Sequence, residues 1–454
     1  MYLRRAAAGI AFGLLFVAVS GGCWGGDVQA AVIHVPADHS TIQAAIDAAQ
    51  DGDVVEIAPG AYSGDGNRDL SFRGKAITIR PRDGFGSVTL DLLYGQDGSH
   101  RAFIFDSSEG RDAVLQGIRI ENSVHDGGAG VWIRGDAAPT IAECEFTSCL
   151  SLGYGEPRGG GGILCDGQAK PLVQRCLFLR CESVTSGSAI SVEGSAILEM
   201  EECHVERSAI AAAIEVAPGA RADIRNCDIL DSLEAGAVAG GGTISLTGCG
   251  LAGGNGAAAV SSNGTLTMDR CTVGSNRGFS YGGLWVNAGA HASVRNTIFR
   301  NNCDVHGSRD DITVRDGGEL ELYCCAIDLS AIHGDIDLEL GAPHVYGDPR
   351  LCDAPLCPDG YNSAGTFSID EYSPCAAAPS PCGEQIGALG VGCSFGPGEG
   401  ACCLPDGSCF VTLEAVCAGL SGDYSGDGIG CFSNPCTASP QLEESWGGIK
   451  ARFR

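Results

Sequence analysis

Four charged residues stand within or just after short strand-like segments: Arg134, Asp166, Glu193 and Glu215. Two carboxylates one strand apart could bind Ca²⁺ through their oxygens, and Asp166 and Glu193 are the pair for such a site. Such a pair could also raise one another's pKa for acid–base catalysis, while the arginine neutralises a uronate. The four residues therefore form a candidate catalytic group. The alternative is that an acidic repeat protein places carboxylates side by side without any function.

Two tryptophans, Trp132 and Trp285, fall on the same segments and are expected to face outward. An exposed indole can stack on a sugar ring, and a large exposed aromatic side chain is costly without such a role. The alternative is that a loop folds over each indole. The longest loop, residues 147–162, adds Tyr154 and Arg158 to this candidate binding group. The tryptophans are about six repeats apart, so only a long glycan or a protein surface could contact both.

The composition narrows the class of protein. Among 454 residues, 56 acidic against 28 basic side chains give a formal charge of −28, which argues against nucleic acid as a partner. The 69 glycines are about twice the usual share, which excludes a Leu- and Ala-rich helical protein. No zinc, Ser-His-Asp or phosphate-loop motif is visible in the sequence.

The first 30 residues have the pattern of a signal peptide. Two arginines precede an apolar run over residues 6–19, and a small-x-small pattern ends at Ala30. A lipoprotein attached at Cys23 is the alternative, but the residues before that cysteine match the lipoprotein pattern poorly. No later run is long and apolar enough to span a membrane. We therefore expect a secreted or cell-surface protein, in a compartment where disulfides persist.

A repeat organises the middle of the chain. Its pattern is apolar, x, apolar, x, x, Cys, x, apolar, and the intervals run from 22 to 32 residues. The cysteine position is occupied in turn by Ile118, Cys144, Cys176, Cys203, Cys227, Cys249, Cys271, Thr297 and Cys325.

The spacing inside each repeat predicts its shape. Apolar residues alternate with period 2, as in strands, but the alternation breaks once, which indicates a corner between two short strands. A third strand lies upstream in each repeat, such as 131–133 or 284–286, and commonly ends in a glycine turn, such as Gly135 or Gly264. Three strands per coil predict an all-β parallel β-helix of roughly eleven or twelve coils, in which each coil buries its apolar face against its neighbours.

The start of the chain after the signal resembles a known group. Residues 40–49, STIQAAIDAA, and 52–62, GDVVEIAPGAY, are similar to the capping helix and first coil of right-handed β-helix proteins of the pectin-lyase-like superfamily. Ser40 is the expected N-cap of that helix. The resemblance covers about residues 31–393 and implies the fold. It implies that a working site would lie on the outward side of the strand leading each coil, but no particular activity, because the superfamily includes lyases, esterases, hydrolases and adhesins.

The cysteines of the repeat share one inward register and should form a buried ladder. Parallel side chains in register leave Cβ atoms about 4.8 Å apart, whereas a disulfide prefers about 3.8 Å. We therefore expect stacked thiols that act as small apolar side chains. Better disulfide candidates are Cys149 and Cys181, which begin the loops, and Cys303 with Cys324.

The sequence divides into four parts. Residues 1–30 are the signal peptide and residues 31–394 the β-helix with its C-terminal cap. Residues 400–436 hold six cysteines, which predicts a separate module with three disulfides, and residues 437–454 are a basic and aromatic tail. The module's cysteines are Cys402, Cys403, Cys409, Cys417, Cys431 and Cys436.

Asp310 and Asp311 suggest a glycosidase pair, but they directly precede the strand at 312–314. We expect them to mark the entrance of a coil.

The sequence favours an exported, monomeric binding or structural protein that presents an acidic face to glycans or to envelope and extracellular proteins. Ca²⁺ is the one cofactor that the acidic residues suggest. The alternative is a polysaccharide lyase or esterase using the candidate catalytic group. The charge of −28 disfavours bare acidic polysaccharides as ligands unless Ca²⁺ bridges them.

Overall fold

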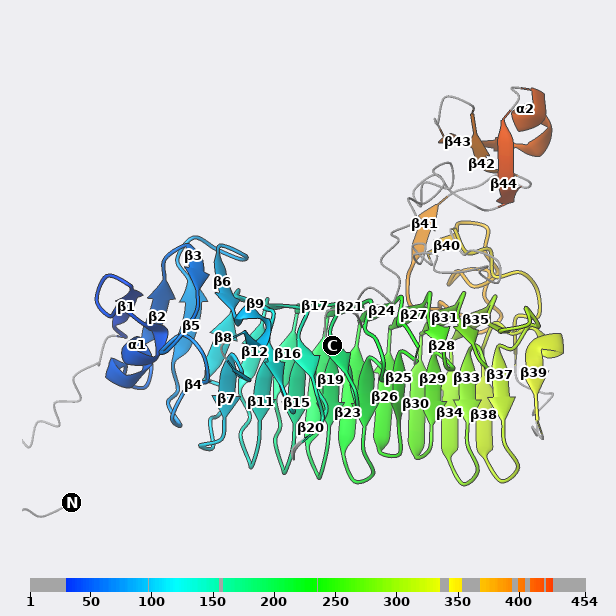
Figure 1. The fold of residues 1–454 in the computed structure, drawn as a ribbon. Helices are drawn as coiled ribbons and strands as arrows, with labels where there is room; N and C mark the ends of the chain where they lie inside the picture. The colour runs from blue at the N-terminus through cyan, green and yellow to red at the C-terminus, as the bar shows by residue number, and fades with distance from the viewer. Residues whose placement is uncertain are drawn as a thin grey trace, which may run out of the picture. The chain divides into compact units, whose positions relative to one another are not determined.

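The computed structural model describes residues 30–427, apart from 97, 155–157, 235, 335–342, 353–367, 394–398, 405–408 and 420–421. Its main part is a parallel β-helix in which three long sheets run along successive coils (Figure 1). None of the helices among the described residues has the length and apolarity needed to cross a membrane.

Sheet A has 12 strands, which agrees with the predicted number of coils. They are β1 (Val32–Val35), β2 (Val54–Ile57), β5 (Thr78–Pro81), β8 (Val114–Gln116), β12 (Thr140–Ala142), β16 (Leu172–Gln174), β20 (Ile197–Glu201), β23 (Arg221–Arg225), β26 (Thr243–Thr247), β30 (Thr265–Asp269), β34 (His291–Arg295) and β38 (Glu319–Tyr323).

Sheet B has 10 strands, and each follows a strand of sheet A in the same coil, from β2 to β34. They are β3 (Gly60–Tyr62), β6 (Val88–Asp91), β9 (Arg119–Glu121), β13 (Glu145–Thr147), β17 (Leu177–Leu179), β21 (His204–Glu206), β24 (Asp228–Leu230), β27 (Gly250–Ala252), β31 (Thr272–Gly274) and β35 (Ile298–Arg300).

Sheet C has 11 strands and contains the candidate site. They are β4 (Leu70–Ser71), β7 (Phe103–Phe105), β11 (Val131–Ile133), β15 (Ile163–Cys165), β19 (Ile190–Val192), β22 (Ile214–Val216), β25 (Val238–Gly240), β29 (Val260–Ser262), β33 (Leu284–Val286), β37 (Ile312–Val314) and β39 (Ile332–His333).

Short strands and turns fill the rest of each coil. Two three-stranded sheets lie in the loops between sheets B and C: β10 (Val124–His125), β14 (Leu150–Ser151) and β18 (Glu182–Ser183), then β28 (Asn255–Gly256), β32 (Arg277–Gly278) and β36 (Cys303–Asp304). Two 3-10 turns cover η1 (Leu93–Gly95) and η2 (Leu329–Ala331).

The predicted corner between sheets A and B is made by one residue in the left-handed conformation. In most coils this residue is not glycine, for example Glu143 with φ 53° and Arg175 with φ 51°. The predicted glycine turns after sheet C are present with positive φ at Gly135, Gly167, Gly194 and Gly317. Gly264 is an exception, since its φ lies outside the left-handed region.

The helix α1 (Ile42–Ala48) lies where the sequence predicts one, but its N-cap is Thr41 and not Ser40. The Thr41 Oγ1 accepts a hydrogen bond from the Ala44 N–H at 3.3 Å, which is the bond an N-cap makes. Its apolar side, including Ile42, Ala45 and Ile46, is buried in the same core as the first strands. That the helix closes the end of the solenoid stays a prediction.

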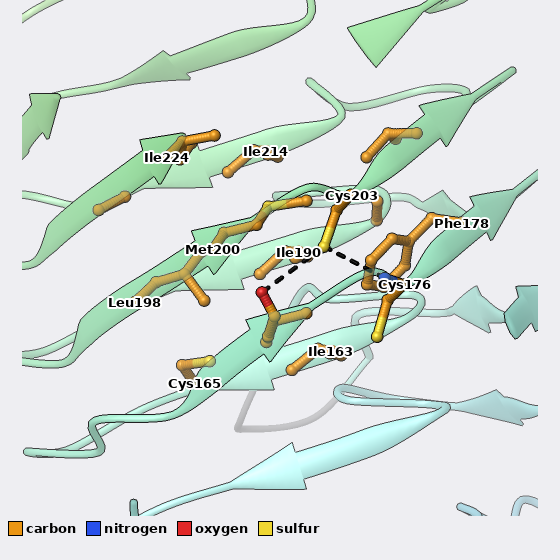
Figure 2. Packing of buried hydrophobic residues seen from close by; sticks show 14 of the residues in the cluster. Ile163, Cys165, Cys176, Phe178, Ile190, Leu198, Met200, Cys203, Ile214 and Ile224 are labelled. Atoms are coloured by element: carbon orange, nitrogen blue, oxygen red, sulfur yellow. Dashed lines mark hydrogen bonds between the residues drawn. The ribbon is translucent and has the colours of Figure 1, made fainter. Parts of the chain in front are cut away.

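The interior is filled by aliphatic and aromatic side chains stacked from coil to coil (Figure 2). Phe146 and Phe178, from consecutive strands of sheet B, stack with ring centroids 4.8 Å apart. This distance is the strand spacing itself, so identical residues in register pack face to face.

Beyond the last coil, the chain folds back on sheet B. Ile386 joins an apolar cluster with Ile298 and Ala326, and the Ala388 N–H donates to the Thr272 Oγ1 at 3.0 Å. β40 (Ile369–Asp370) pairs with β41 (Val391–Cys393) in this region. The predicted module contains β42 (Glu399–Cys403), β43 (Cys409–Leu413), α2 (Glu414–Gly419) and β44 (Asp423–Asp427).

Candidate functional site

The outward residues of sheet C form a column and pair from coil to coil in the register that the sequence predicts. Each residue pairs with the next along the helix, and six steps separate the two tryptophans. Loops cover part of this column, because Leu164 and Ser191 are buried. The open surface is therefore narrower than the sequence suggests. The column contains Ile104, Trp132, Leu164, Ser191, Glu215, Ala239, Ser261, Trp285 and Thr313.

Trp132 is the centre of a polar cluster. Its Nε1–H donates to the Asp166 Oδ2 at 3.0 Å, and Asp166 comes from the following coil. The guanidinium of Arg134 lies over the indole, 4.3 Å from the ring centroid, and that of Arg101 lies 4.6 Å from it. Both distances are within the range of a cation–π contact. The half-buried indole is thus fixed in place by two cations and one carboxylate.

Sequence reasoning missed Arg101. This residue is only 7% exposed, and burial lowers its pKa to about 10, against the opposing effect of Asp69 and Asp126. Its Nε–H donates to the Gly127 carbonyl at 3.0 Å. Nothing in the repeat pattern marks position 101, because the residue belongs to a loop before β7 and meets Trp132 only through the stacking of coils.

A histidine and a carboxylate lie beside Arg101. Asp69 Oδ2 contacts the His100 Nδ1 at 2.6 Å, and its Oδ1 accepts from the Arg101 backbone N–H at 3.0 Å. Burial lowers the pKa of His125 to about 4, and the Arg101 charge adds to that effect. His125 is therefore neutral at physiological pH.

Glu193 is held by two serines. The Ser186 and Ser191 hydroxyls donate to its Oε1 at 3.3 and 3.2 Å. The two hydroxyl oxygens are themselves 3.1 Å apart. The carboxylate therefore has donors within its own coil.

Glu215 lies in the outward column of the two tryptophans, next to the column of Asp166 and Glu193. Its Oε2 accepts from the Gly187 backbone N–H at 3.3 Å. Burial raises the pKa of Glu215, the Gly187 hydrogen bond lowers it, and the charge of Glu193 raises it further. A carboxyl with a raised pKa can act as a general acid, which is a role that Glu215 could take in catalysis.

The structure brings the four charged residues together only in part. Asp166 and Glu193 follow consecutive strands in one column, whereas Glu215 pairs with Ser191 in the adjacent column. Within the described part of the chain, no group of three or more His, Cys, Asp or Glu side chains is placed to hold a metal. Asp166 and Glu193 thus offer a pair of carboxylates, and the Ca²⁺ site stays a prediction.

Trp285 has different neighbours. The Tyr281 ring stacks on it with centroids 4.8 Å apart and an interplanar angle of 24°. The Arg315 guanidinium lies 5.8 Å from the indole centroid. The Trp285 Nε1 is buried and has no hydrogen-bond partner among the described residues. A loop residue therefore covers this indole, which was the alternative to an open aromatic platform.

The loop residues of the predicted binding group are exposed. Tyr154 is 85% exposed and Arg158 is also at the surface. Residues 155–157 between them lie outside the described part of the chain. Their assignment to ligand binding stays a prediction.

The cysteine ladder is confirmed as a set of free, buried thiols. Each Sγ serves as a hydrogen-bonding group at the corner between sheets A and B: the Cys176 N–H donates to the Cys203 Sγ at 3.4 Å, and that thiol donates to the Val173 carbonyl at 3.5 Å (Figure 2). Thr297 takes the same place with its hydroxyl, which accepts from the Cys271 N–H at 3.3 Å. The free ladder cysteines are Cys144, Cys176, Cys203, Cys227, Cys249, Cys271 and Cys325.

Burial favours the protonated form of a thiol. It raises the pKa of Cys325 to about 12 and that of Cys271 well above its ordinary value. Because only the thiolate is a strong nucleophile or metal ligand, Cys271 and Cys325 are chemically inert while the coils stay closed.

Two disulfide predictions are wrong. Cys149 and Cys181 are free and buried, because they form a second inward column parallel to the first and point the same way. Cys324 bonds to Cys382, not to Cys303, with Cα atoms 6.0 Å apart. The fold-back of the C-terminal segment brings Cys382 to the last coil, which the sequence does not reveal.

The module's cysteines are confirmed in part. Cys402 bonds to Cys417 with a Cα separation of 5.5 Å. Cys403 is also disulfide-bonded, as is Cys303 in the β-helix. The side chain of Cys409, and the whole of Cys431 and Cys436, lie outside the described part of the structure. The tail 437–454 and the signal peptide up to residue 29 lie outside it too.

Asp310 and Asp311 do mark the entrance of a coil, directly before β37. Asp311 is 2% exposed, and its Oδ1 accepts from the Asn302 backbone and side-chain N–H groups at 3.1 and 2.8 Å. Asn302 in turn accepts from the Asn276 Nδ2–H at 2.9 Å. Burial raises the pKa of Asp311 to about 6, although the Asn302 hydrogen bonds oppose the rise. Asp311 therefore has a structural role as the acceptor for Asn302 at the entrance of the coil.

Comparison with known proteins agrees with this architecture. A family model described as a right handed beta helix region matches residues 95–249 and 188–308. The fold of the chain is therefore a right-handed parallel β-helix. This β-helix is similar to a solved structure described as a mannuronic acid specific polysaccharide family 6 lyase enzyme from human gut microbiota, with 13% identity and a TM-score of 0.31. That alignment covers 64% of this chain and 77% of the other. A search of curated proteins returned no match.

Proposed function

We propose that this protein is exported and binds glycans along the outward face of sheet C, without catalysing a reaction on them. The observation that carries the proposal is the cluster at Trp132, where Arg134 lies over a half-buried indole and Asp166 holds the indole N–H. Such a surface is rigid before a ligand arrives, so little conformational entropy is lost on binding.

The cluster offers suitable groups to a sugar. Arg134 is exposed and makes no ion pair among the described residues, so its guanidinium is available to hydroxyl or carboxylate oxygens. The indole and the aliphatic part of the arginine supply apolar surface for the C–H face of a sugar ring. Tyr154, on the long loop, adds a second exposed aromatic ring.

The surrounding carboxylates favour binding over turnover. Asp166 accepts from Trp132, Glu193 from two serines, and Glu215 from the Gly187 N–H. Each carboxylate thus has a donor in the wall of the site, which fixes its position and suits a structural role.

The second candidate function is a polysaccharide lyase or carbohydrate esterase. The observation that favours it is the raised pKa of Glu215 beside the carboxylate of Glu193. A carboxyl with a raised pKa and a neighbouring carboxylate can divide the acid and base roles between them.

Export is part of the proposal. The disulfides Cys324–Cys382 and Cys402–Cys417 support an oxidising compartment, where such bonds persist. We propose the cell surface or the medium as its location, reached through the signal peptide. Sequencing the N-terminus of the exported protein tests this, and a mature chain starting at Ala31 is expected.

One experiment separates the two functions. The mature chain is incubated with pectins, other uronate polymers and neutral polysaccharides, with and without Ca²⁺, while binding and new reducing ends, unsaturated products or methanol are measured. Binding without product, weakened about tenfold by Trp132→Ala, is expected. Turnover that disappears in Asp166→Ala and Glu193→Ala would establish the enzyme instead. Binding to envelope proteins but to no glycan would contradict both.

A further inference from the structure

Trp285 is an indole whose ring face is already occupied by another ring. Tyr281, four residues earlier in the same coil, stacks on it at 4.8 Å in a nearly parallel orientation. Phe279, in the same loop, is 67% exposed. Aromatic residues on a surface loop are costly to leave in water, so this group has the composition of a contact surface.

The indole N–H beneath this stack lacks an acceptor. The Trp285 Nε1 is buried without a hydrogen-bond partner among the described residues, whereas the Trp132 Nε1 donates to Asp166 at 3.0 Å. A buried donor without an acceptor is unfavourable, because it has lost its hydrogen bond to water without replacement. The covered Trp285 indole therefore has one unsatisfied hydrogen-bond donor.

The register explains why the acceptor is missing. Trp132 pairs with Leu164, and Asp166 stands two residues after that partner. Trp285 pairs with Thr313, and the residue two positions later is Arg315. An arginine side chain has donors and no acceptor, so it can lie over the ring at 5.8 Å but cannot accept the indole N–H.

We propose that Trp285 is a second sugar-binding position and that the Tyr281 ring occupies it until a ligand arrives. A sugar ring would replace Tyr281 on the indole, since its C–H face can stack as the phenol ring does. One of its oxygens would accept the Trp285 N–H, and Arg315 would donate to another. This inference rests on the proposed function, because it names a second position for the same class of ligand.

The position predicts a preference for long chains. Trp132 and Trp285 share one column and are six strand spacings apart, which corresponds to roughly 29 Å. A glycan that reaches both positions gains affinity because the second contact becomes intramolecular. Short oligosaccharides can occupy only one position and gain nothing from the other.

The test measures affinity by calorimetry with the mature chain. The probes are oligogalacturonides, xylo-oligosaccharides and cello-oligosaccharides of about three and about ten residues. Trp285→Ala is expected to weaken binding of the long chains about tenfold and to leave the short ones unchanged at Trp132. Tyr281→Ala is expected to tighten binding about threefold, since the competing ring is gone. Tyr281→Phe is the matched control and keeps the parent affinity.

The outcomes separate this inference from the proposed function. Long-chain binding that is lost in Trp132→Ala but unchanged in Trp285→Ala overturns the second position and leaves the proposed function standing. Absence of binding by every probe overturns both.

A second measurement needs no glycan. In protein labelled with ¹⁵N-tryptophan, Tyr281→Ala should speed hydrogen exchange of the Trp285 indole N–H at least about tenfold, with the Trp132 signal unchanged. Equal exchange in parent and variant would show that Tyr281 does not cover the indole, and would overturn the proposal.

Discussion

Trp132 and Trp285 occupy the same outward column of sheet C, yet the two indoles differ in the hydrogen bond of the N–H and in the ring that covers them. At Trp132 the indole N–H donates to Asp166, and Arg101 and Arg134 lie over the ring. At Trp285 the N–H has no partner among the described residues and the ring is stacked by Tyr281. One indole is locked into the wall and the other is covered by a loop.

The difference comes from a single place in the next coil. The position held by Asp166 at the first tryptophan is held by Arg315 at the second. In a β-helix the neighbours of an outward side chain come from adjacent coils, tens of residues away in sequence. Two tryptophans at the same position of the repeat therefore differ in their contacts because the following coil supplies a different side chain to each.

The largest expected effect that tests this comparison is on stability. Trp132→Ala should lower the free energy of unfolding by about 3 to 4 kcal/mol, and Trp285→Ala by about 1 to 2 kcal/mol. The reason is that the first variant removes the indole that covers Arg101, a cation only 7% exposed, and leaves Asp166 without its donor. Urea unfolding of the mature chain measures both values.

Trp132→Phe is the control for this prediction, because it keeps an aromatic ring for Arg101 and removes only the N–H donor. It should cost clearly less than the alanine variant. Equal losses for Trp132→Ala and Trp285→Ala would mean that the locked and the covered tryptophan do not differ in the way described.

The second effect concerns a carboxyl near Trp285. Asp311 directly precedes β37, the strand that pairs with the strand of Trp285. The residue at the same place before β15, which pairs with the strand of Trp132, is Gly162. Asp311 has a folded-state pKa of about 6, which exceeds the ordinary 3.8, so the native chain binds the proton more tightly than the unfolded chain. Stability therefore falls as pH rises from about 4 to about 6, and stays lower above that range.

Asp311→Asn should remove this loss, because an asparagine oxygen can still accept from Asn302 and carries no charge. We expect the variant to be about 2 to 3 kcal/mol more stable than the parent at pH 8, and to match it near pH 4. Thermal unfolding across this pH range measures the difference. A parallel offset of both curves at every pH would contradict the assignment to Asp311.

The smallest effect tests the position that Asp166 occupies next to Trp132 and Arg315 occupies next to Trp285. Arg315→Asp should supply the acceptor that the Trp285 N–H lacks and stabilise the protein by about 1 kcal/mol. Asp166→Ala is the matched control at the other tryptophan, and it should destabilise by a similar amount. If both variants change stability in the same direction, the hydrogen bond of the indole is not what distinguishes the two sites.

Much of the architecture was predictable because a solenoid repeats its own pattern. The strand at 131–133 and its equivalents, the inward cysteine column and the order of the outward columns all follow from period-2 alternation with one break. The thiol state of Cys144 and its partners also followed, since parallel side chains one strand spacing apart do not suit a disulfide.

The errors lie where the chain leaves the repeat. The sequence suggests Cys149 and Cys181, at the start of the loops, as disulfide candidates, but both lie in the interior and are free. The sequence suggests Cys303 as the partner of Cys324, but Cys324 bonds to Cys382, 58 residues away. The fold-back of the C-terminal segment on sheet B depends on apolar contacts with Ile298 and Ala326, and no periodic signal encodes them.

The sequence by itself determined the β-helix, the register of its coils and the two tryptophans that share one outward column. These features depend on the alternation of apolar residues and on the corner residues, and both recur in each repeat. Only the tertiary structure decided that Arg101 lies over Trp132, that Tyr281 covers Trp285, and that Asp166 and Arg315 hold equivalent places. The physical reason is that loops of unequal length return to the same sheet, so their side chains meet through stacking and not through sequence spacing.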